Sequence, residues 1–109
     1  MKVAIVESRN LDVDISKYIP EKTTTIVTGG AKGIDCLAEE FADKNNIKKI
    51  IFKPQYERYK KAAPIMRNIL IVNESDLIVA IWNGKSKGTK FTIDYARKMN
   101  KEVRVFTKK

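Results

Sequence analysis

A strand, a glycine turn and the start of a helix follow one another in the run Ile26-Val27-Thr28-Gly29-Gly30-Ala31-Lys32-Gly33-Ile34-Asp35. Residues 23–27 are all β-branched, which favours a strand, and two glycines come soon after them. After the turn, apolar residues recur at the spacing of one helix face; they are Ile34, Leu37, Ala38, Phe41 and Ala42. The run therefore predicts a strand-turn-helix unit.

This unit has a chemical use. The first turn of a helix leaves backbone N–H groups without partners and carries the positive end of the helix dipole. Glycines let the backbone come close to a bound group, and Lys32 adds a positive charge, so the turn can cradle a phosphate. The alternative is a tight connection without a ligand. The run is neither a Walker loop nor the dinucleotide motif G-x-G-x-x-G.

The rest of the chain alternates strands with helices. We expect further strands at 3–6, 49–52, 76–82 and 103–106, and helices at 12–19, from 34 to about 45, from 64 to about 73 and from 89 to about 99. Residues 55–63 are predicted to form a polar and aromatic loop. The run 76–82 is the most hydrophobic, so we expect it at the centre of the sheet. The alternation predicts an α/β fold, a single Rossmann-like three-layer sandwich with a mostly parallel five-stranded sheet, forming one domain over residues 1–109.

Composition narrows the classes of function. The chain of 109 residues has no histidine and one cysteine, which excludes the usual zinc sites, Ser-His and Cys-His catalytic pairs and an internal disulfide. No metal and no cofactor is predicted. No apolar run approaches a membrane span, and the N-terminus lacks the pattern of a signal peptide, so we expect a cytoplasmic protein without membrane contact. The net charge of +9 favours an anionic partner; alternatively, the charges serve only to keep the protein surface soluble.

Unusual residues follow three of the predicted strands, at 7–9, 28–33 and 83–89. The carboxyl ends of parallel strands meet at one edge of a sheet, where Rossmann-like folds bind their ligands. Two of these segments are glycine loops that carry lysines and open a helix. Their convergence predicts an anion site at that edge, with Lys32, Lys85 and Lys87 as the lysines that contact phosphate.

The series of motifs at 28–35, at Met66-Arg67-Asn68 and at 76–82 followed by Gly84 and Gly88-Thr89 resembles the SLOG superfamily, and most closely its YspA-like branch. The resemblance covers nearly the whole chain. It implies a Rossmann-like homodimer that binds a nucleotide or a nucleotide-derived ligand, with both glycine loops on phosphate and the arginine in the pocket. Ser8-Arg9 matches the end of a Gly-Ser-Arg signature, with Glu7 in place of the glycine. The candidate ligand-binding residues are Ser8, Arg9, Gly29, Gly30, Ala31, Lys32, Gly33, Arg67, Asn68, Gly84, Lys85, Ser86, Lys87, Gly88 and Thr89.

Two related families point to different activities. Lonely Guy phosphoribohydrolases use an arginine, which Arg67 matches, and a glutamate, whose position holds Thr92 here. Asp94 lies on a different face of the same predicted helix. DNA-processing protein A shares the Gly-Ile-Asp pattern and binds single-stranded DNA. We therefore expect a binding module or sensor without catalytic residues, and a nucleotide phosphoribohydrolase and a nucleic-acid binder stay as alternatives.

Several side chains allow more than one role. Arg67 opens a helix among apolar neighbours, which calls for an anionic ligand or a buried aspartate as its partner. Asn68 suits a bond to loop backbone, and Thr89 suits a helix N-cap or a phosphate contact. Aromatic side chains that could stack on a base or fill the edge of the core are Tyr56, Tyr59 and Trp82.

Overall fold

The computed structural model describes residues 1–7, 14–29 and 34–107. Its strands are β1 (Lys2–Glu7), β2 (Thr25–Thr28), β3 (Lys48–Ile51), β4 (Leu77–Trp82) and β5 (Glu102–Thr107). Its helices are α1 (Ile34–Lys44), α2 (Tyr56–Tyr59), α3 (Ala63–Glu74) and α4 (Lys87–Lys98), with short 3-10 helices η1 (Ile15–Tyr18) and η2 (Lys60–Ala62).

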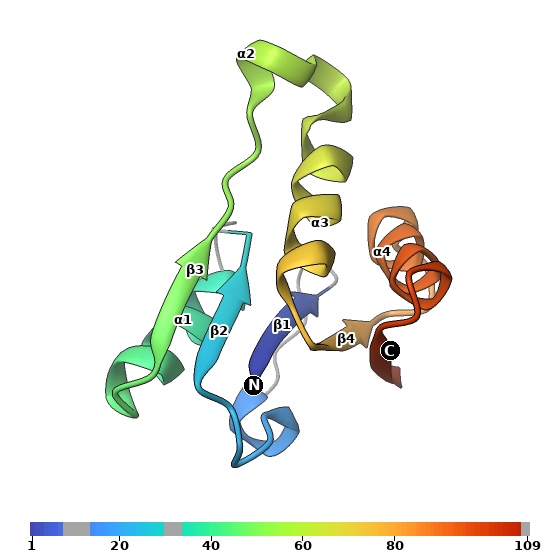
Figure 1. Cartoon of the computed structure of the whole chain (residues 1–109). Helices are drawn as coiled ribbons and strands as arrows, with labels where there is room; N and C mark the ends of the chain where they lie inside the picture. Colours follow the sequence, from blue (N-terminus) through green and yellow to red (C-terminus); the bar gives the residue numbers. More distant parts are fainter. Residues whose placement is uncertain (8–13, 30–33, 108–109) are drawn as a thin grey trace.

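The five strands form one parallel sheet in the order β3-β2-β1-β4-β5. Ala4 in the middle strand pairs with Val27 on one side and with Ile78 on the other. The chain runs outward from β1 to β3, and the connection through α3 then returns it to β4 beside β1 (Figure 1). The predicted α/β class and Rossmann-like sandwich are confirmed. The direction of strand addition reverses between β1 and β4, and such a reversal opens a crevice at the carboxyl ends of the strands.

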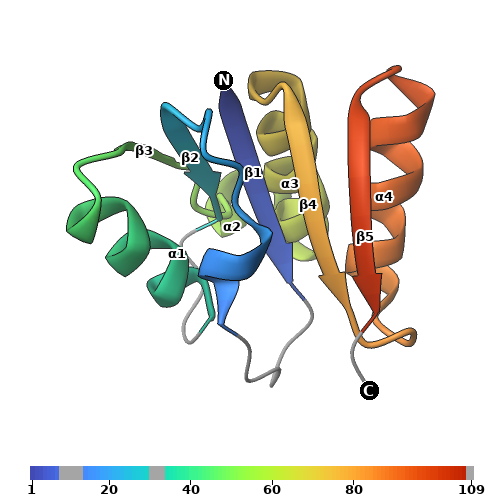
Figure 2. The same cartoon turned by 90° about the horizontal axis from the view of Figure 1, so that it is seen from below.

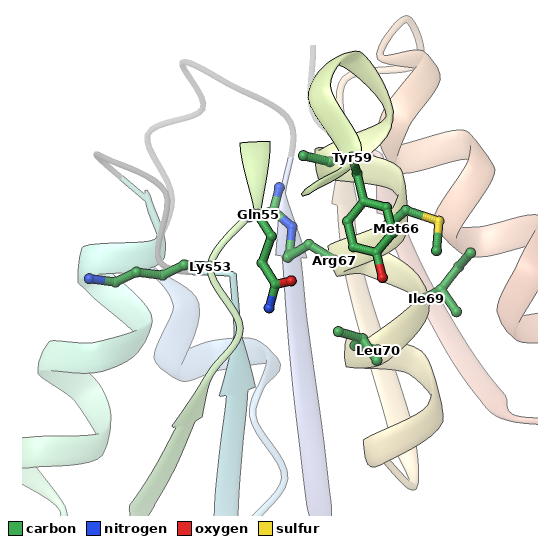
Figure 3. Close-up of a pocket in the computed structure, with 8 residues that line it drawn as sticks. Lys53, Gln55, Tyr59, Met66, Arg67, Ile69 and Leu70 are labelled. Carbon is green, nitrogen blue, oxygen red and sulfur yellow. The ribbon is translucent and has the colours of Figure 1, made fainter. Parts of the chain in front are cut away.

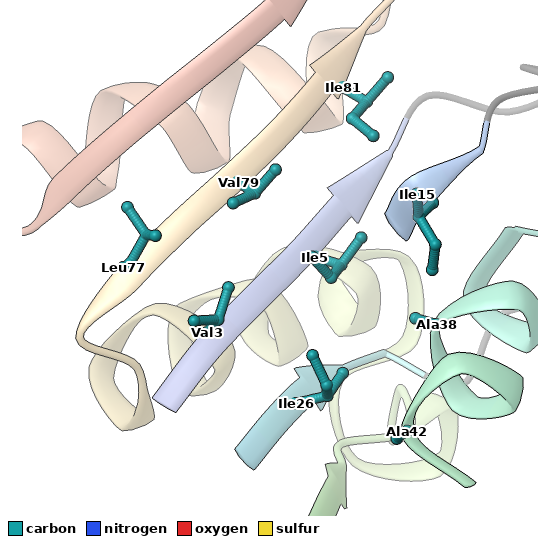
Figure 4. Close-up of a cluster of buried hydrophobic side chains, with 9 residues drawn as sticks. All are labelled: Val3, Ile5, Ile15, Ile26, Ala38, Ala42, Leu77, Val79 and Ile81. Atoms are coloured by element: carbon teal, nitrogen blue, oxygen red, sulfur yellow. The ribbon is translucent and has the colours of Figure 1, made fainter. Parts of the chain in front are cut away.

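Helices cover both faces of the sheet (Figure 2). Alternate residues of each strand point to opposite faces, and each face has its own core. On the α1 face, the strand residues Ile5, Ile26 and Val79 pack with Ala38 of α1 (Figure 4). On the other face, α3 and α4 pack over the sheet through a second cluster, Ala4, Val6, Val27, Ile71, Val72, Ile78 and Ala96. These two cores fix the helices relative to the strand ends.

The helix ends follow local sequence signals. Asn45 Nδ2 donates to the carbonyl oxygen of Phe41 (2.9 Å), and Asn46 takes the left-handed conformation (φ 54°), so α1 stops near the predicted asparagine pair. Asn100 also takes the left-handed conformation, directly after Met99 at the end of α4 (φ 59°). Among the helices of the described ranges, none is long and apolar enough to cross a membrane.

Two predictions about elements were wrong. The middle strand is β1, and the more hydrophobic β4 lies next to it. Both β1 and β4 are interior strands, and burial on both faces makes both apolar whatever their order. Within the predicted loop 55–63, residues 56–62 form α2 and η2. Their polar and aromatic composition, without buried residues in either helix, hides the helical turns from an apolar-periodicity argument.

We predict unequal costs for truncating isoleucines on the α3 face. Ile78 is fully buried in the interior strand β4, so Ile78→Ala should lower the free energy of unfolding by about 2–5 kcal/mol. Ile50 is half-buried on the edge strand β3, and Ile50→Ala should cost clearly less. Urea denaturation of both variants measures the difference. Equal losses would contradict the assignment of β3 to the sheet edge.

Candidate functional site

The predicted site residues gather at the carboxyl edge of the sheet. Gly29 follows β2, the segment 83–89 follows β4, and Arg67 and Asn68 lie in the first half of α3, the half near the same edge (Figure 1). The other predicted site residues lie outside the described residues; they are Ser8, Arg9, Gly30, Ala31, Lys32 and Gly33.

Arg67 is anchored on the glycine that ends β2. Its Nη1 donates to the carbonyl oxygen of Gly29 (2.8 Å), and its Nε donates to Oδ1 of Asn68 (2.8 Å). The guanidinium also lies against the Cα of Gly29: a Cβ there would come within 2.8 Å of Cζ and 3.0 Å of Cδ. A side chain at position 29 would therefore require the arginine to move from this position. The acceptors of these two bonds are a backbone carbonyl and a side-chain amide.

A chain of hydrogen bonds continues from Arg67 to the second glycine loop. Nδ2 of Asn68 donates to Oγ1 of Thr92 (2.8 Å), and this hydroxyl donates to the carbonyl oxygen of Gly88 (2.9 Å). We call the series Gly29, Arg67, Asn68, Thr92 and Gly88 the polar relay. It joins the end of β2, the helix α3 and the first turn of α4. Asn68 thus bonds to side chains, rather than to loop backbone as expected.

The loop before α4 is held by its own side chains. Oδ1 of Asn83 accepts from the backbone N–H groups of Lys85 and Ser86 (both 2.8 Å), and Gly84 supplies the positive φ of the turn (81°). Trp82 Nε1 donates to the carbonyl oxygen of Ser86 (3.0 Å). Trp82 is half-buried at the end of β4, in agreement with the expected place at the edge of the core, and its indole also braces the loop.

Ser86, and not Thr89, is the N-cap of α4. Its Oγ accepts from the backbone N–H of Thr89 (3.3 Å), because the helix begins at Lys87, within the segment 83–89 that was predicted as a loop. Thr89 is buried in the first turn. Gly88 lies beside it, and a Cβ built on Gly88 would meet no atom within 4 Å among the described residues. Packing therefore does not demand a glycine there, although glycine costs about 1 kcal/mol relative to alanine inside a helix.

Thr28 contributes a second feature that packing leaves unexplained. Thr28 is fully buried, and its Oγ1 has no hydrogen-bond partner within the described part of the chain. A buried hydroxyl without a partner costs about 1–3 kcal/mol. This polar atom lies directly before the glycine turn, at the edge where the relay begins.

Two segments near this edge contain more basic than acidic residues. The residues that follow β3 include Lys53, Arg58, Lys60 and Lys61 but one acidic residue, Glu57. The segment 83–90 carries Lys85, Lys87 and Lys90 and no acidic residue. Lys85 and Lys87 are exposed. An anion that approaches this edge therefore meets a positive potential from both sides of the relay.

The structure also places the residues on which hydrolase chemistry would depend. Thr92, at the position of the expected glutamate, is fully buried and both donates and accepts within the relay. Asp94 lies on the solvent side of α4, where its carboxylate pairs with Lys90 (2.9 Å). No group of three potential metal-ligating side chains occurs in residues 1–7, 14–29 and 34–107.

Sequence reasoning missed Thr92, Asn83 and Trp82 as residues that hold the site. Thr92 had a usable signal, since a threonine four residues after Gly88 in a helix can bond to its carbonyl. Asn83 before Gly84 is likewise a common turn pair.

Comparison with known proteins supports the sequence resemblance. Residues 9–59 match the model of the YspA, cpYpsA-related SLOG family, from the end of β1 through the first glycine turn to α2. No curated protein and no solved structure shows a significant match. The family match is consistent with a nucleotide-related function. It confirms, over residues 9–59, the relationship to the SLOG superfamily that the sequence predicted.

Proposed function

We propose that this protein binds a nucleotide, or a nucleotide-derived phosphate ligand, at the carboxyl edge of the sheet and acts as a sensor or binding module. The phosphate lies between the glycine turn after β2 and the first turn of α4, with Arg67 between them. Lys85 and Lys87 add positive charge from the loop. The homodimer and the cytoplasmic location implied earlier stay predictions.

The polar relay is the observation that carries this proposal. Five residues from three segments bond in series, and they tie the guanidinium of Arg67 to both glycine loops. An arginine held in this way keeps its orientation, so it loses little conformational entropy when an anion binds. The open space beside Gly88 supports the same proposal, because a phosphate can approach the helix backbone closely there.

Binding without turnover fits the side chains better than hydrolysis. Release of a base in the manner of the phosphoribohydrolases requires a carboxylate beside the arginine. Thr92 occupies that position and its hydroxyl is committed to two hydrogen bonds. Asp94 is paired with Lys90 at the surface, away from the relay.

Single-stranded nucleic acid is the second candidate ligand, since basic residues flank the relay on both sides. Affinity that comes from such exposed lysines falls steeply with salt through counterion release. A mononucleotide held by Arg67 and by backbone N–H groups should lose much less affinity between about 50 and 200 mM salt. Comparing the two salt dependences separates the candidates.

The first variant tests Arg67 directly. Arg67→Ala should weaken the binding of pyrophosphate, used as the probe, by about 1.5–3 kcal/mol, the usual worth of a charge-assisted hydrogen bond. Isothermal titration calorimetry measures the change. Arg104→Ala is the matched control, because Arg104 is an exposed arginine of β5 that pairs with Glu102 (3.2 Å). If both variants bind alike, net charge and not the relay accounts for binding, and the proposal is wrong.

A second pair of variants tests the relay behind Arg67. Thr92→Val keeps the shape of the side chain but leaves the amide of Asn68 and the carbonyl of Gly88 without this hydroxyl. We expect it to lower the free energy of unfolding by about 1–3 kcal/mol and to weaken pyrophosphate binding. Thr92→Ser keeps the hydroxyl and should retain the affinity, at a cost of about 1 kcal/mol for the lost methyl group.

Urea denaturation and calorimetry on the two Thr92 variants give both quantities. A loss of stability in Thr92→Val with wild-type affinity would show that the relay serves the fold alone. In the Arg67→Ala background, Thr92→Val should have no further effect on pyrophosphate binding, since the relay acts through the arginine.

A further inference from the structure

A pocket lies beside the relay, between α3 and the segment that connects β3 to α2 (Figure 3). Lys53 and Gln55 of the connecting segment lie on one side of it. Side chains of α2 and α3 line the other side, and Arg67 lies between the two (Figure 3). The pocket therefore borders the proposed phosphate site directly.

The side of the pocket formed by α2 and α3 is mainly apolar, and we call it the carbon wall. Tyr59, Met66, Ile69 and Leu70 line it, with Ala63 buried among them. Leu70 is 45% exposed, so apolar surface on this wall remains in contact with water. The guanidinium of Arg58 lies over the ring of Tyr59, with its Cζ 5.2 Å from the ring centroid, so a base would stack on the opposite face of this ring. A wall of this kind gains free energy when a flat apolar group covers it.

Polar groups border the same wall. The amide of Gln55 offers both a donor and an acceptor at the opposite side, whereas the ammonium end of Lys53 points away from the pocket (Figure 3). A nucleobase has carbon-rich faces and a rim of donors and acceptors, and it matches a carbon wall opposite an amide. An acyl chain cannot form hydrogen bonds with the amide, and a bare phosphate has no apolar surface to pack against the wall.

Arg67 connects the pocket to the glycine turn. The same side chain lines the pocket and donates to the carbonyl oxygen of Gly29. A ligand whose anionic group meets Arg67 at the turn can therefore place the group attached to it in the pocket.

We propose that the base of the nucleotide lies across this shallow pocket of about 60 Å³, against the wall formed by Tyr59, Met66 and Leu70, and that this contact makes the site selective for nucleotides over simple sugar phosphates. This inference rests on the proposed phosphate site at Arg67. The carbon wall supplies affinity without distinguishing strongly among bases, because every base has a face that stacks on an aromatic ring.

The test compares ribose 5-phosphate with the monophosphates AMP, GMP, CMP and UMP by calorimetry. At least one of the monophosphates should bind tenfold or more tightly than ribose 5-phosphate. Tyr59→Ala should weaken monophosphate binding by about 5- to 150-fold, the range reported by alanine substitution of stacking residues, and should leave ribose 5-phosphate unchanged. Tyr59→Phe keeps the ring and should retain the affinity. Tyr56→Ala, an exposed tyrosine of the same helix outside the pocket, is the matched control.

The outcomes separate this inference from the proposed function. If ribose 5-phosphate binds in a manner that depends on Arg67, but the monophosphates bind no better and Tyr59→Ala changes nothing, the phosphate site stands and the base pocket is wrong. If no phosphate compound binds, both the proposed phosphate site and the base pocket are wrong. Light scattering gives a last check: a fall in molecular mass in Tyr59→Ala would assign the pocket to contact between two copies of the chain and overturn the inference.

Discussion

The packing of the Arg67 guanidinium on Gly29 is the constraint on which the site depends. A cation at the start of α3, near apolar core residues, needs acceptors, and it finds them in the carbonyl of Gly29 and the amide of Asn68. In this position the guanidinium occupies the space that a Cβ at residue 29 would take. It also fixes where α3 begins relative to the sheet. The loss of either residue would therefore alter both the turn and the helix.

The relay extends this constraint to α4. Asn68 and Thr92 join two helices that already pack together through Ile71 and Ala96, so apolar contacts and hydrogen bonds support the same arrangement. The carbonyl of Gly88 is the last acceptor, and Ser86, Asn83 and Trp82 brace the loop before it. Gly29 and Gly88, which are far apart in the sequence, are thereby connected at one edge of the sheet. A pre-organised edge of this kind binds an anion at low entropic cost.

The fold could be predicted from the sequence because its signals are local. The β-branched run before Gly29, the helical spacing after it and the asparagines at Asn45 and Asn46 each act within a few residues. The order of the strands was harder to predict, because the hydrophobicity of a strand indicates its burial but not its position in the sheet. The middle position, which was predicted for β4, is occupied by β1.

The relay could not be predicted from the sequence. Its bonds join residues 38 and 24 positions apart, and asparagine and threonine have many other uses in helices and loops. The resemblance to the SLOG superfamily named Arg67 as a candidate site residue, but it gave no reason for Thr92. The base pocket depends on α2, which carries no apolar periodicity, so the sequence offered only Tyr59 as one of several aromatic residues.

Nuclear magnetic resonance of ¹⁵N-labelled protein during titration with pyrophosphate tests the central claim most directly. The account holds that one anion contacts both glycine loops and Arg67. It predicts that the backbone amides of Gly29 and Gly88 and the Nε–H of Arg67 shift together, with one dissociation constant. Shifts confined to the exposed basic residues of α4 and β5, or different dissociation constants for the two loops, would contradict it.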